Sequence, residues 1–299
     1  LDLYITADCD KVKFIELEWK FRSSDNIYVL GDAWERSYTD LEFVKLGNND
    51  RWMPWYFIAT DKQTSMCFGV KTGCNTYISF RYTSDGIKAL IDCRNGGNGV
   101  HLNGRKLHAA TFVYKKYDSD DVFSCLCDYC KTLCDNPYLP EEIIYGGNNW
   151  YYAYGKSSYE EIISDTKLQV ELAEGIENRP FEVIDDCWQI NSTEGPWIPN
   201  EKFGDMKQLA DEMKSMGVKP GLWFRPLHDA KAYEEHPEWR IHKGPDKQTL
   251  TFLDPSHPEV KAYLHGEMTK LREWGFELVK HDFSTYDMFD RFGFDLNGK

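Results

Sequence analysis

Short runs of alternating apolar and polar residues fill the first 117 residues of the chain. Lys11–Trp19 and Thr76–Tyr82 are two such runs, and both are rich in β-branched and aromatic residues. A period of two is typical of strands with one buried face, and turns rich in glycine and asparagine, such as 47–50 and 95–99, separate the runs. The pattern predicts an antiparallel β-sandwich over residues 1–117.

Helical spacing replaces this alternation between Asp118 and Cys134, and Pro137 and Pro140 then end it. We therefore assign residues 118–140 as a linker helix and loop. Beyond the linker, strands alternate with amphipathic helices, which is typical of βαβ units around a parallel sheet. The pattern predicts strands at 143–147, 181–185, 218–224 and 276–280, and helices at 159–174, 205–216 and 258–274.

The second region, residues 141–299, is too short for a complete barrel. An eightfold (β/α)8 barrel of the TIM type takes about 250 residues, whereas residues 143–299 number 157. The fold class is therefore α/β with an all-β N-terminal domain, and two interpretations of the parallel part stay open. It is either a smaller open sheet or about four βα units of a barrel that a longer protein completes.

Composition narrows the classes of partner. The 35 basic and 49 acidic residues give a net charge of −14, which repels nucleic acid, and no apolar stretch reaches the roughly 20 residues of a membrane span. Nine cysteines is an odd number, so we expect reduced thiols, which favour the cytoplasm. The cysteines between Cys125 and Cys134 do not form the two C-x-x-C pairs of a zinc site, and no histidine lies nearby to complete a set of ligands. We expect them on a helix face, with no metal and no cofactor.

Polar and aromatic side chains follow each predicted parallel strand. In parallel α/β folds the working residues gather at the carboxyl ends of the strands. Carboxylates and cations hydrogen-bond sugar hydroxyls, and flat aromatic faces stack on pyranose rings, so the mixture indicates a carbohydrate partner. The residues concerned are Trp150 after the first strand, Asp185, Asp186 and Trp188 after the second, Arg225 after the third, and Lys280 and Asp282 at the fourth.

Two features of this set have alternative interpretations. Asp282 lies two residues after Lys280, so both point to one side of the sheet. The lysine either favours the ionised carboxylate that a nucleophile needs or forms a structural ion pair at the strand end. Asp185 and Asp186 either grip two vicinal hydroxyls or cap the turn that leaves the strand. The stretch from His228 to His257 is predicted to be a long loop, either an active-site lid or a solvated connector.

The motifs together carry a family resemblance. Ile184–Trp188, Pro220–Phe224 and Val279–Asp282 come in the order and spacing of the α-galactosidase clan of glycoside hydrolases, and the chain resembles above all its family 36 or melibiase-like branch. Asn149–Trp150 and Gly31–Tyr38 are also similar to that branch. The resemblance covers nearly the whole chain and implies an N-terminal β-sandwich followed by a (β/α)8 barrel.

The resemblance also implies a function and a role for each residue. The chain is expected to be a retaining, exo-acting α-galactosidase-type glycosidase that cleaves terminal α-galactosides through a covalent glycosyl-enzyme. Asp282 would be the nucleophile. Lys280 would contact ring hydroxyls, Asp185 and Asp186 would hold the 4- and 6-hydroxyls, and Trp150 and Trp188 would be walls. Arg225 stands where many relatives carry glutamate before proline, so the contacts with the leaving group are expected to differ there, and Arg225 is counted among the substrate-binding residues. Asp32 and Arg36 either add substrate contacts or form an ion pair between the domains.

The family's general acid/base follows the sixth barrel strand and has no counterpart in this sequence. We therefore expect the chain to be inactive by itself, and its missing half to come from a longer protein or from a second copy in a homo-oligomer. Two alternatives to α-galactosidase activity stay open. One is an α-N-acetylgalactosaminidase or another α-glycosidase of the clan, and the other is a catalytically dead homologue that binds carbohydrate.

Overall fold

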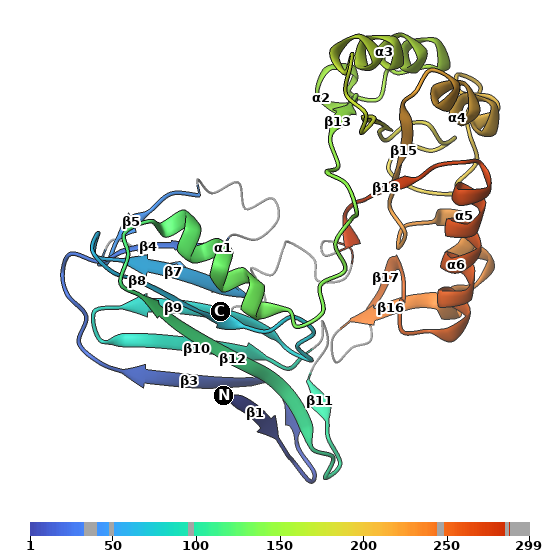
Figure 1. Ribbon diagram of the computed structural model, residues 1–299. Coiled ribbons are helices and arrows are strands. Elements are labelled where there is room, and N and C mark those ends of the chain that lie inside the picture. Colours follow the sequence, from blue (N-terminus) through green and yellow to red (C-terminus); the bar gives the residue numbers. More distant parts are fainter. Residues whose placement is uncertain (33–40, 48–50, 95–98, 244–247, 285–286, 288–299) are drawn as a thin grey trace. The chain divides into compact units, whose positions relative to one another are not determined.

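The computed structural model describes residues 1–32, 41–47, 51–94, 99–243, 248–284 and 287 (Figure 1). The chain forms two compact units, and the main division falls between Tyr138 and Leu139. The first unit is built from antiparallel sheets and one helix, whereas the second contains a parallel sheet with helices. None of the helices in the described ranges has the length and apolar character that crossing a bilayer requires.

Two antiparallel sheets form the first unit. The larger has the order β1 (Asp2–Ile5), β12 (Leu107–Tyr117), β8 (Ser65–Val70), β7 (Tyr56–Thr60), β4 (Tyr28–Gly31) and β5 (Val44–Lys45). The smaller has the order β3 (Phe14–Lys20), β10 (Gly86–Asp92), β9 (Tyr77–Thr83) and β6 (Met53–Pro54). A separate pair joins β2 (Lys11–Val12) to β11 (Val100–His101). The antiparallel sheets predicted from the alternating pattern are confirmed.

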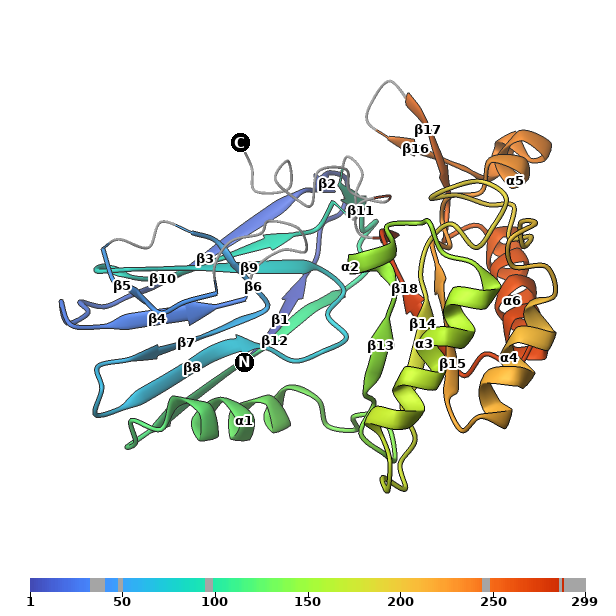
Figure 2. The same cartoon turned by 90° about the horizontal axis from the view of Figure 1, so that it is seen from above.

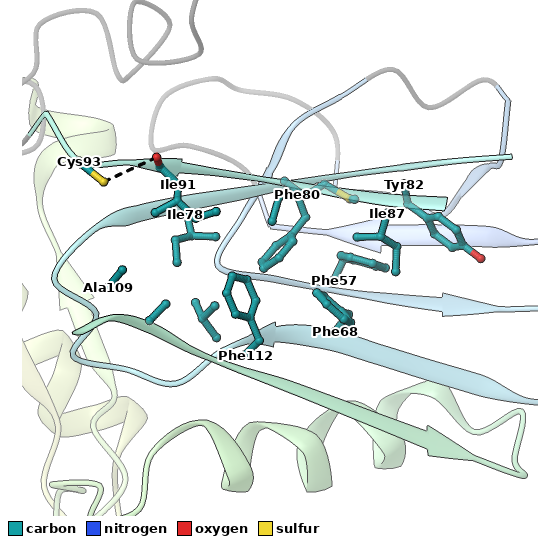
Figure 3. Packing of buried hydrophobic residues seen from close by; sticks show 14 of the residues in the cluster. Phe57, Phe68, Ile78, Phe80, Tyr82, Ile87, Ile91, Cys93, Ala109 and Phe112 are labelled. Atoms are coloured by element: carbon teal, nitrogen blue, oxygen red, sulfur yellow. Dashed lines mark hydrogen bonds between the residues drawn. The ribbon is translucent and has the colours of Figure 1, made fainter. Parts of the chain in front are cut away.

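Aromatic side chains fill the space between these sheets (Figure 3). Phe68 of β8 meets Phe80 of β9 edge to face, with ring centroids 5.4 Å apart, and Phe57 of β7 meets Phe80 at 5.9 Å. Edge-to-face contacts between rings stabilise a core beyond the burial of apolar area. This core explains the large aromatic content of the alternating runs.

Helix α1 (Val122–Leu133) covers the other face of the larger sheet. Its Cys125 and Tyr129 pack against Ile58 and Cys67, which alternate along β7 and β8 with the inward-facing phenylalanines. The Tyr129 hydroxyl donates to the carbonyl of Val113 at 2.9 Å. The helix assigned to a linker over 118–140 is thus packed on the first unit, and Cys125 lies in its apolar face.

The second unit has a parallel sheet in the order β13 (Gly146–Asn148), β14 (Phe181–Ile184), β15 (Lys219–Phe224) and β18 (Leu278–His281). Its helices are α2 (Trp150–Ala153), α3 (Tyr159–Leu172), α4 (Met206–Ser215) and α6 (Pro258–Glu273). The predicted parallel sheet is confirmed. The first strand begins later than predicted, since Ile143 and Ile144 are 79% and 53% exposed.

Helices α3, α4 and α6 lie along one side of the parallel sheet (Figure 2). Ile162, Leu209 and Leu271 of these helices pack in one core with Ile184 and Phe224 of the strands. Ser158 and Asp205 cap the starts of α3 and α4 with their side chains. Helix packing on one face leaves the polar residues at the strand ends to form the site described below.

The connection between β15 and α6 is folded rather than a long loop. It contains α5 (Ala230–Glu235), a 3-10 turn (Pro237–Trp239) and a hairpin of β16 (Arg240–Lys243) and β17 (Gln248–Leu253). Tyr233, Trp239 and Leu253 form a small core of their own with Ala232 and Val260. The prediction of a loop over 228–257 was wrong because this satellite core lies within a stretch whose charged residues hide its pattern.

Candidate active site

Strand register brings three positions to one level of the sheet. Ile184 pairs with Leu222, so the next residue, Asp185, is level with Trp223, which in turn pairs with Lys280. Residues level with one another on adjacent strands project from the same face. The carboxyl ends of β14, β15 and β18 therefore present Asp185, Trp223 and Lys280 together.

Asp185 makes hydrogen bonds to residues of several elements at this level of the sheet. It is 3% exposed, and its Oδ2 accepts from Nζ of Lys280 at 2.5 Å and from Nδ2 of Asn148 at 2.7 Å. Its Oδ1 accepts from the amide of Asp186 at 2.8 Å, and its own amide donates to Oδ1 of Asn149 at 2.8 Å. Asp185 thus ties β13, β14 and β18 together, and the ion pair of Lys280 crosses the sheet to Asp185.

Asp186 lies in the turn that leaves β14. It is 5% exposed, and its Oδ1 accepts from the amide of Cys187 at 2.7 Å, from Nε2 of Gln189 at 2.7 Å and from the amide of Thr193 at 3.0 Å. Its Oδ2 has no hydrogen-bond partner among the residues that the structure describes. One oxygen organises the loop, as the turn interpretation predicts, and the other is available to a ligand.

Asp282 follows β18 and extends its ladder, because its amide donates to the carbonyl of Phe224 at 3.1 Å. Nε1 of Trp223 donates to its Oδ2 at 3.0 Å, and the amide of Phe283 donates to its Oδ1 at 2.9 Å. Trp223 is 1% exposed, so its indole is fixed by packing. Both carboxylate oxygens of Asp282 are therefore oriented by hydrogen-bond donors.

The structure places the two predicted aromatic walls differently. Trp188 is 0% exposed, its Nε1 donates to the carbonyl of Trp223 at 2.9 Å, and its ring packs 6.2 Å from that of Trp197. Trp188 therefore supports Trp223 from within the core, and its assignment as a wall is wrong because no face is left for a sugar. Trp150 begins α2, is half-buried and packs against Tyr154 at 5.8 Å.

Arg225 is predicted to contact the leaving group, and the structure encloses it instead. Its guanidinium makes two hydrogen bonds to Asp287, at 3.0 and 2.6 Å, and the two residues are 6% and 0% exposed. The guanidinium also lies 4.4 Å from the ring centroid of Phe283. Because the protein occupies three of its five N–H donors and buries the side chain, the structure gives no support to the direct contact, which stays a prediction. No sequence pattern marks Asp287, which lies 62 residues away.

Two further predicted residues belong to the Gly31–Tyr38 motif. Asp32 directly follows β4 in the first unit and is half-buried. Arg36 lies outside the described residues. Their predicted substrate contacts and ion pair therefore stay predictions.

Three residues of the site are not among those predicted from the sequence: Asn148, Asn149 and Trp223. The signal was present, because Asn148 and Asn149 lie at the end of the first strand and Trp223 lies inside the Pro220–Phe224 motif. Their function is to orient Asp185 and Asp282 rather than to supply charge. Asn148 and Trp223 donate to the two carboxylates, and Asn149 accepts from the amide of Asp185. Neutral amide and indole groups of this kind carry no distinctive pattern in a sequence.

Burial shifts the pKa values of three ionisable side chains around the site: His228, Glu194 and Cys187. Nε2 of His228 lies 3.3 Å from Glu194, but burial lowers the pKa of His228 to about 4 and raises the pKa of Glu194. His228 is therefore neutral at pH 7. Burial also raises the pKa of the Cys187 thiol, which makes it a weak nucleophile. In the described part of the chain, no three histidine, cysteine or acidic side chains are grouped to hold a metal ion.

Glu182 lies on β14, on the side that faces α3. It is 2% exposed, and burial, together with the nearby charge of Asp165, raises the pKa of its carboxyl from 4.5 to about 7. Between these two values the folded protein holds a proton that the unfolded chain has released. The contribution of protonated Glu182 to the free energy of unfolding is therefore complete below pH 4.5 and is lost as the pH rises to about 7.

We predict that Glu182→Gln raises the free energy of unfolding by about 2–3 kcal/mol at pH 8 and changes it little at pH 4, because glutamine is neutral throughout. Urea unfolding at pH 4, 6 and 8 measures the difference. Glu171→Gln, at an exposed position of helix α3, is the control and should leave the free energy of unfolding unchanged at every pH. An equal gain at pH 4 and pH 8 would contradict the assignment.

A family model described as Melibiase matches residues 143–288, which include the parallel sheet and Asp282. Residues 143–288 belong to the melibiase family. The match confirms the resemblance found in the motifs between Asn149 and Asp282.

Curated relatives of the chain carry α-galactosidase names. The chain is 26% identical over 159 residues to alpha-galactosidase Mel36A of Lactobacillus acidophilus, which is 47% of this chain and 20% of the relative. It is 28% identical over 166 residues to probable alpha-galactosidase C of Aspergillus flavus, which is 46% of this chain and 21% of the relative. The chain thus spans about a fifth of the length of these relatives.

Solved structures support the fold over nearly the whole chain. An α-galactosidase from Thermus thermophilus, in complex with p-nitrophenyl α-D-galactopyranoside, superposes with a TM-score of 0.59 at 17% identity, covering 95% of this chain and 63% of that one. The GH36 α-galactosidase AgaA from Geobacillus stearothermophilus gives a TM-score of 0.63 at 18% identity, covering 90% and 41%. A shared fold is what such identities establish.

Proposed function

We propose that the protein carrying this chain is a retaining, exo-acting α-galactosidase with Asp282 as its nucleophile. The observation that carries the proposal is the arrangement of side chains at the carboxyl ends of the parallel strands β14, β15 and β18. There Trp223 orients Asp282, while Lys280 and Asp185 pair on the same face. We also propose that the four parallel strands are the first part of a (β/α)8 barrel, whose mouth these residues line.

Asp282 attacks the anomeric carbon and forms a glycosyl-enzyme, which water then hydrolyses. Trp223 and the Phe283 amide each donate to one of its oxygens and so aim the carboxylate. The acid that protonates the leaving oxygen is assigned to a part of the protein beyond this chain, as in the family. Residues 143–288 thus supply the nucleophile and the sugar contacts.

Recognition of the sugar is assigned to three charged groups and one ring. Oδ2 of Asp186 accepts a hydroxyl of the ring, and Lys280, whose side chain is 33% exposed, donates to another. Asp185 holds Lys280 in place and adds its own acceptor. The exposed part of Trp150 stacks on the sugar face, while the solved relatives with p-nitrophenyl α-D-galactopyranoside and stachyose support terminal α-galactosides as the substrate class.

The substrate test uses the full polypeptide that the gene encodes. We expect kcat/KM for α-galactosides to exceed that for α-glucosides by at least about 100-fold, because an equatorial 4-hydroxyl leaves a buried carboxylate without its partner. Steady-state kinetics with matched p-nitrophenyl glycosides measures the ratio. Equal values would contradict galactose recognition, a preference for α-N-acetylgalactosaminides would reassign the sugar, and sugar binding without hydrolysis would indicate a non-catalytic homologue.

A further inference from the structure

A buried ion pair links the loop that carries Asp186 to the segment that follows Asp282. Arg225, the residue after β15, uses Nε and Nη2 for Asp287. Its remaining nitrogen, Nη1, donates to the main-chain carbonyl of Thr193 at 3.1 Å. One side chain therefore joins the loops that follow three adjacent strands of the sheet, β14, β15 and β18.

Thr193 connects this ion pair to Asp186. Its carbonyl accepts from Arg225, and its amide donates to Oδ1 of Asp186 at 3.0 Å. The φ angle of Thr193 is +62°, in the left-handed region that β-branched residues avoid. Such a conformation persists only where the surrounding structure holds it, and Thr193 is bonded on one side to Arg225 and on the other to Asp186.

The second amide on Asp186 has the same property. Cys187 donates its amide to Oδ1 of Asp186 at 2.7 Å, and its φ is +77°. Two of the donors that orient Asp186 therefore come from strained positions of one loop. The position of this carboxylate depends on what fixes the loop, and not on the sheet alone.

We propose that Arg225 is a positioning residue that holds Asp186 in its sugar-binding orientation through Thr193. The proposal rests on the proposed function, in which Oδ2 of Asp186 accepts a sugar hydroxyl. Arg225 is 6% exposed and packs on Phe283, so it acts through the loop without touching the substrate. Arginine is suited to this position because three of its nitrogens donate in one plane.

Arg225→Lys tests the proposal in the full-length protein. Lysine keeps a cation for Asp287 but has no second nitrogen for Thr193. We expect kcat/KM for an α-galactoside to fall about 10–100-fold, mainly through KM, because a ligand-binding carboxylate loses its orientation. Arg179→Lys is the matched control: Arg179 also donates to main-chain carbonyls, those of Ala173, Ile176 and Gly217, but it precedes β14 at the opposite end of the sheet. It should change kcat/KM less than about twofold.

A double-mutant cycle shows whether Arg225 acts through Asp186. In an Asp186→Asn background, Arg225→Lys should lower kcat/KM by less than about threefold further, because the orientation of Asp186 no longer matters. A full loss in that background would overturn the proposal. If Arg225→Lys does not fold, the pair Arg225→Leu with Asp287→Leu removes both buried charges together, and the same comparison applies.

Hydrogen exchange gives a readout that does not depend on activity. The Thr193 amide is protected by its bond to Asp186, so Arg225→Lys should speed its exchange about tenfold while Arg179→Lys leaves it unchanged. Unchanged exchange in Arg225→Lys would overturn the positioning role. Faster exchange in a protein without glycosidase activity would support the positioning role while the proposed function fails.

Discussion

Asp282→Asn should lower the turnover of α-galactosides by at least about 1000-fold, with sugar affinity and folding nearly unchanged. Asparagine has the same shape as aspartate and keeps one oxygen, which can accept from one of the two donors that orient the side chain, the Trp223 indole or the Phe283 amide. What it lacks is the negative charge that forms the bond to the anomeric carbon. The loss is therefore expected in kcat and not in binding.

Steady-state kinetics of the full-length protein and galactose binding by calorimetry measure the two effects separately. Glu171→Gln is the control for expression and folding, because Glu171 is an exposed residue of α3. Residual activity of Asp282→Asn within tenfold of the parent protein would remove Asp282 from the role of nucleophile.

Lys280→Met should lower the free energy of unfolding by about 2–4 kcal/mol. Asp185 is 3% exposed, and the methionine would leave its carboxylate buried without a cation. The loss is somewhat smaller than for a fully buried pair because the Lys280 side chain is 33% exposed. Galactose binding should weaken in the same variant, since Lys280 is assigned to a ring hydroxyl.

Lys207→Met is the matched control for this stability effect. Lys207 pairs with Asp211 at 2.8 Å on α4, but both side chains are more than half exposed. An exposed pair of this spacing contributes less than about 0.5 kcal/mol. Urea unfolding of both variants measures the difference, and equal losses at positions 280 and 207 would show that Asp185 does not depend on its ion pair.

The sequence was sufficient to predict the antiparallel sheets, the parallel sheet and the polar residues at the ends of its strands. Alternation of apolar and polar residues at a period of two indicates β9 and β3. Apolar residues at helical spacing around Ile162 indicate α3, and those around Leu209 indicate α4, as helices that bury one face. These patterns are local, because the exposure of each position follows from its own strand or helix. The polar residues at the strand ends could be found for the same reason.

The contacts of those residues could not be predicted from the sequence. Asp185 and Lys280 are 95 residues apart, and their ion pair depends on the register between β14, β15 and β18. Trp188 beside two aspartates has the composition of a sugar site. Its direction depends on the loop after β14, where Cys187 adopts a left-handed conformation, and it packs into the core.

A covalent label tests the role of Asp282 as the nucleophile most directly. A mechanism-based fluorinated galactoside, incubated with the full-length protein, should be trapped on the nucleophile as a glycosyl-enzyme. Peptide mass spectrometry then identifies the modified residue. We predict a single labelled peptide with the sugar on Asp282, whereas a sugar on another carboxylate, or turnover with no trapped intermediate, would contradict the assignment.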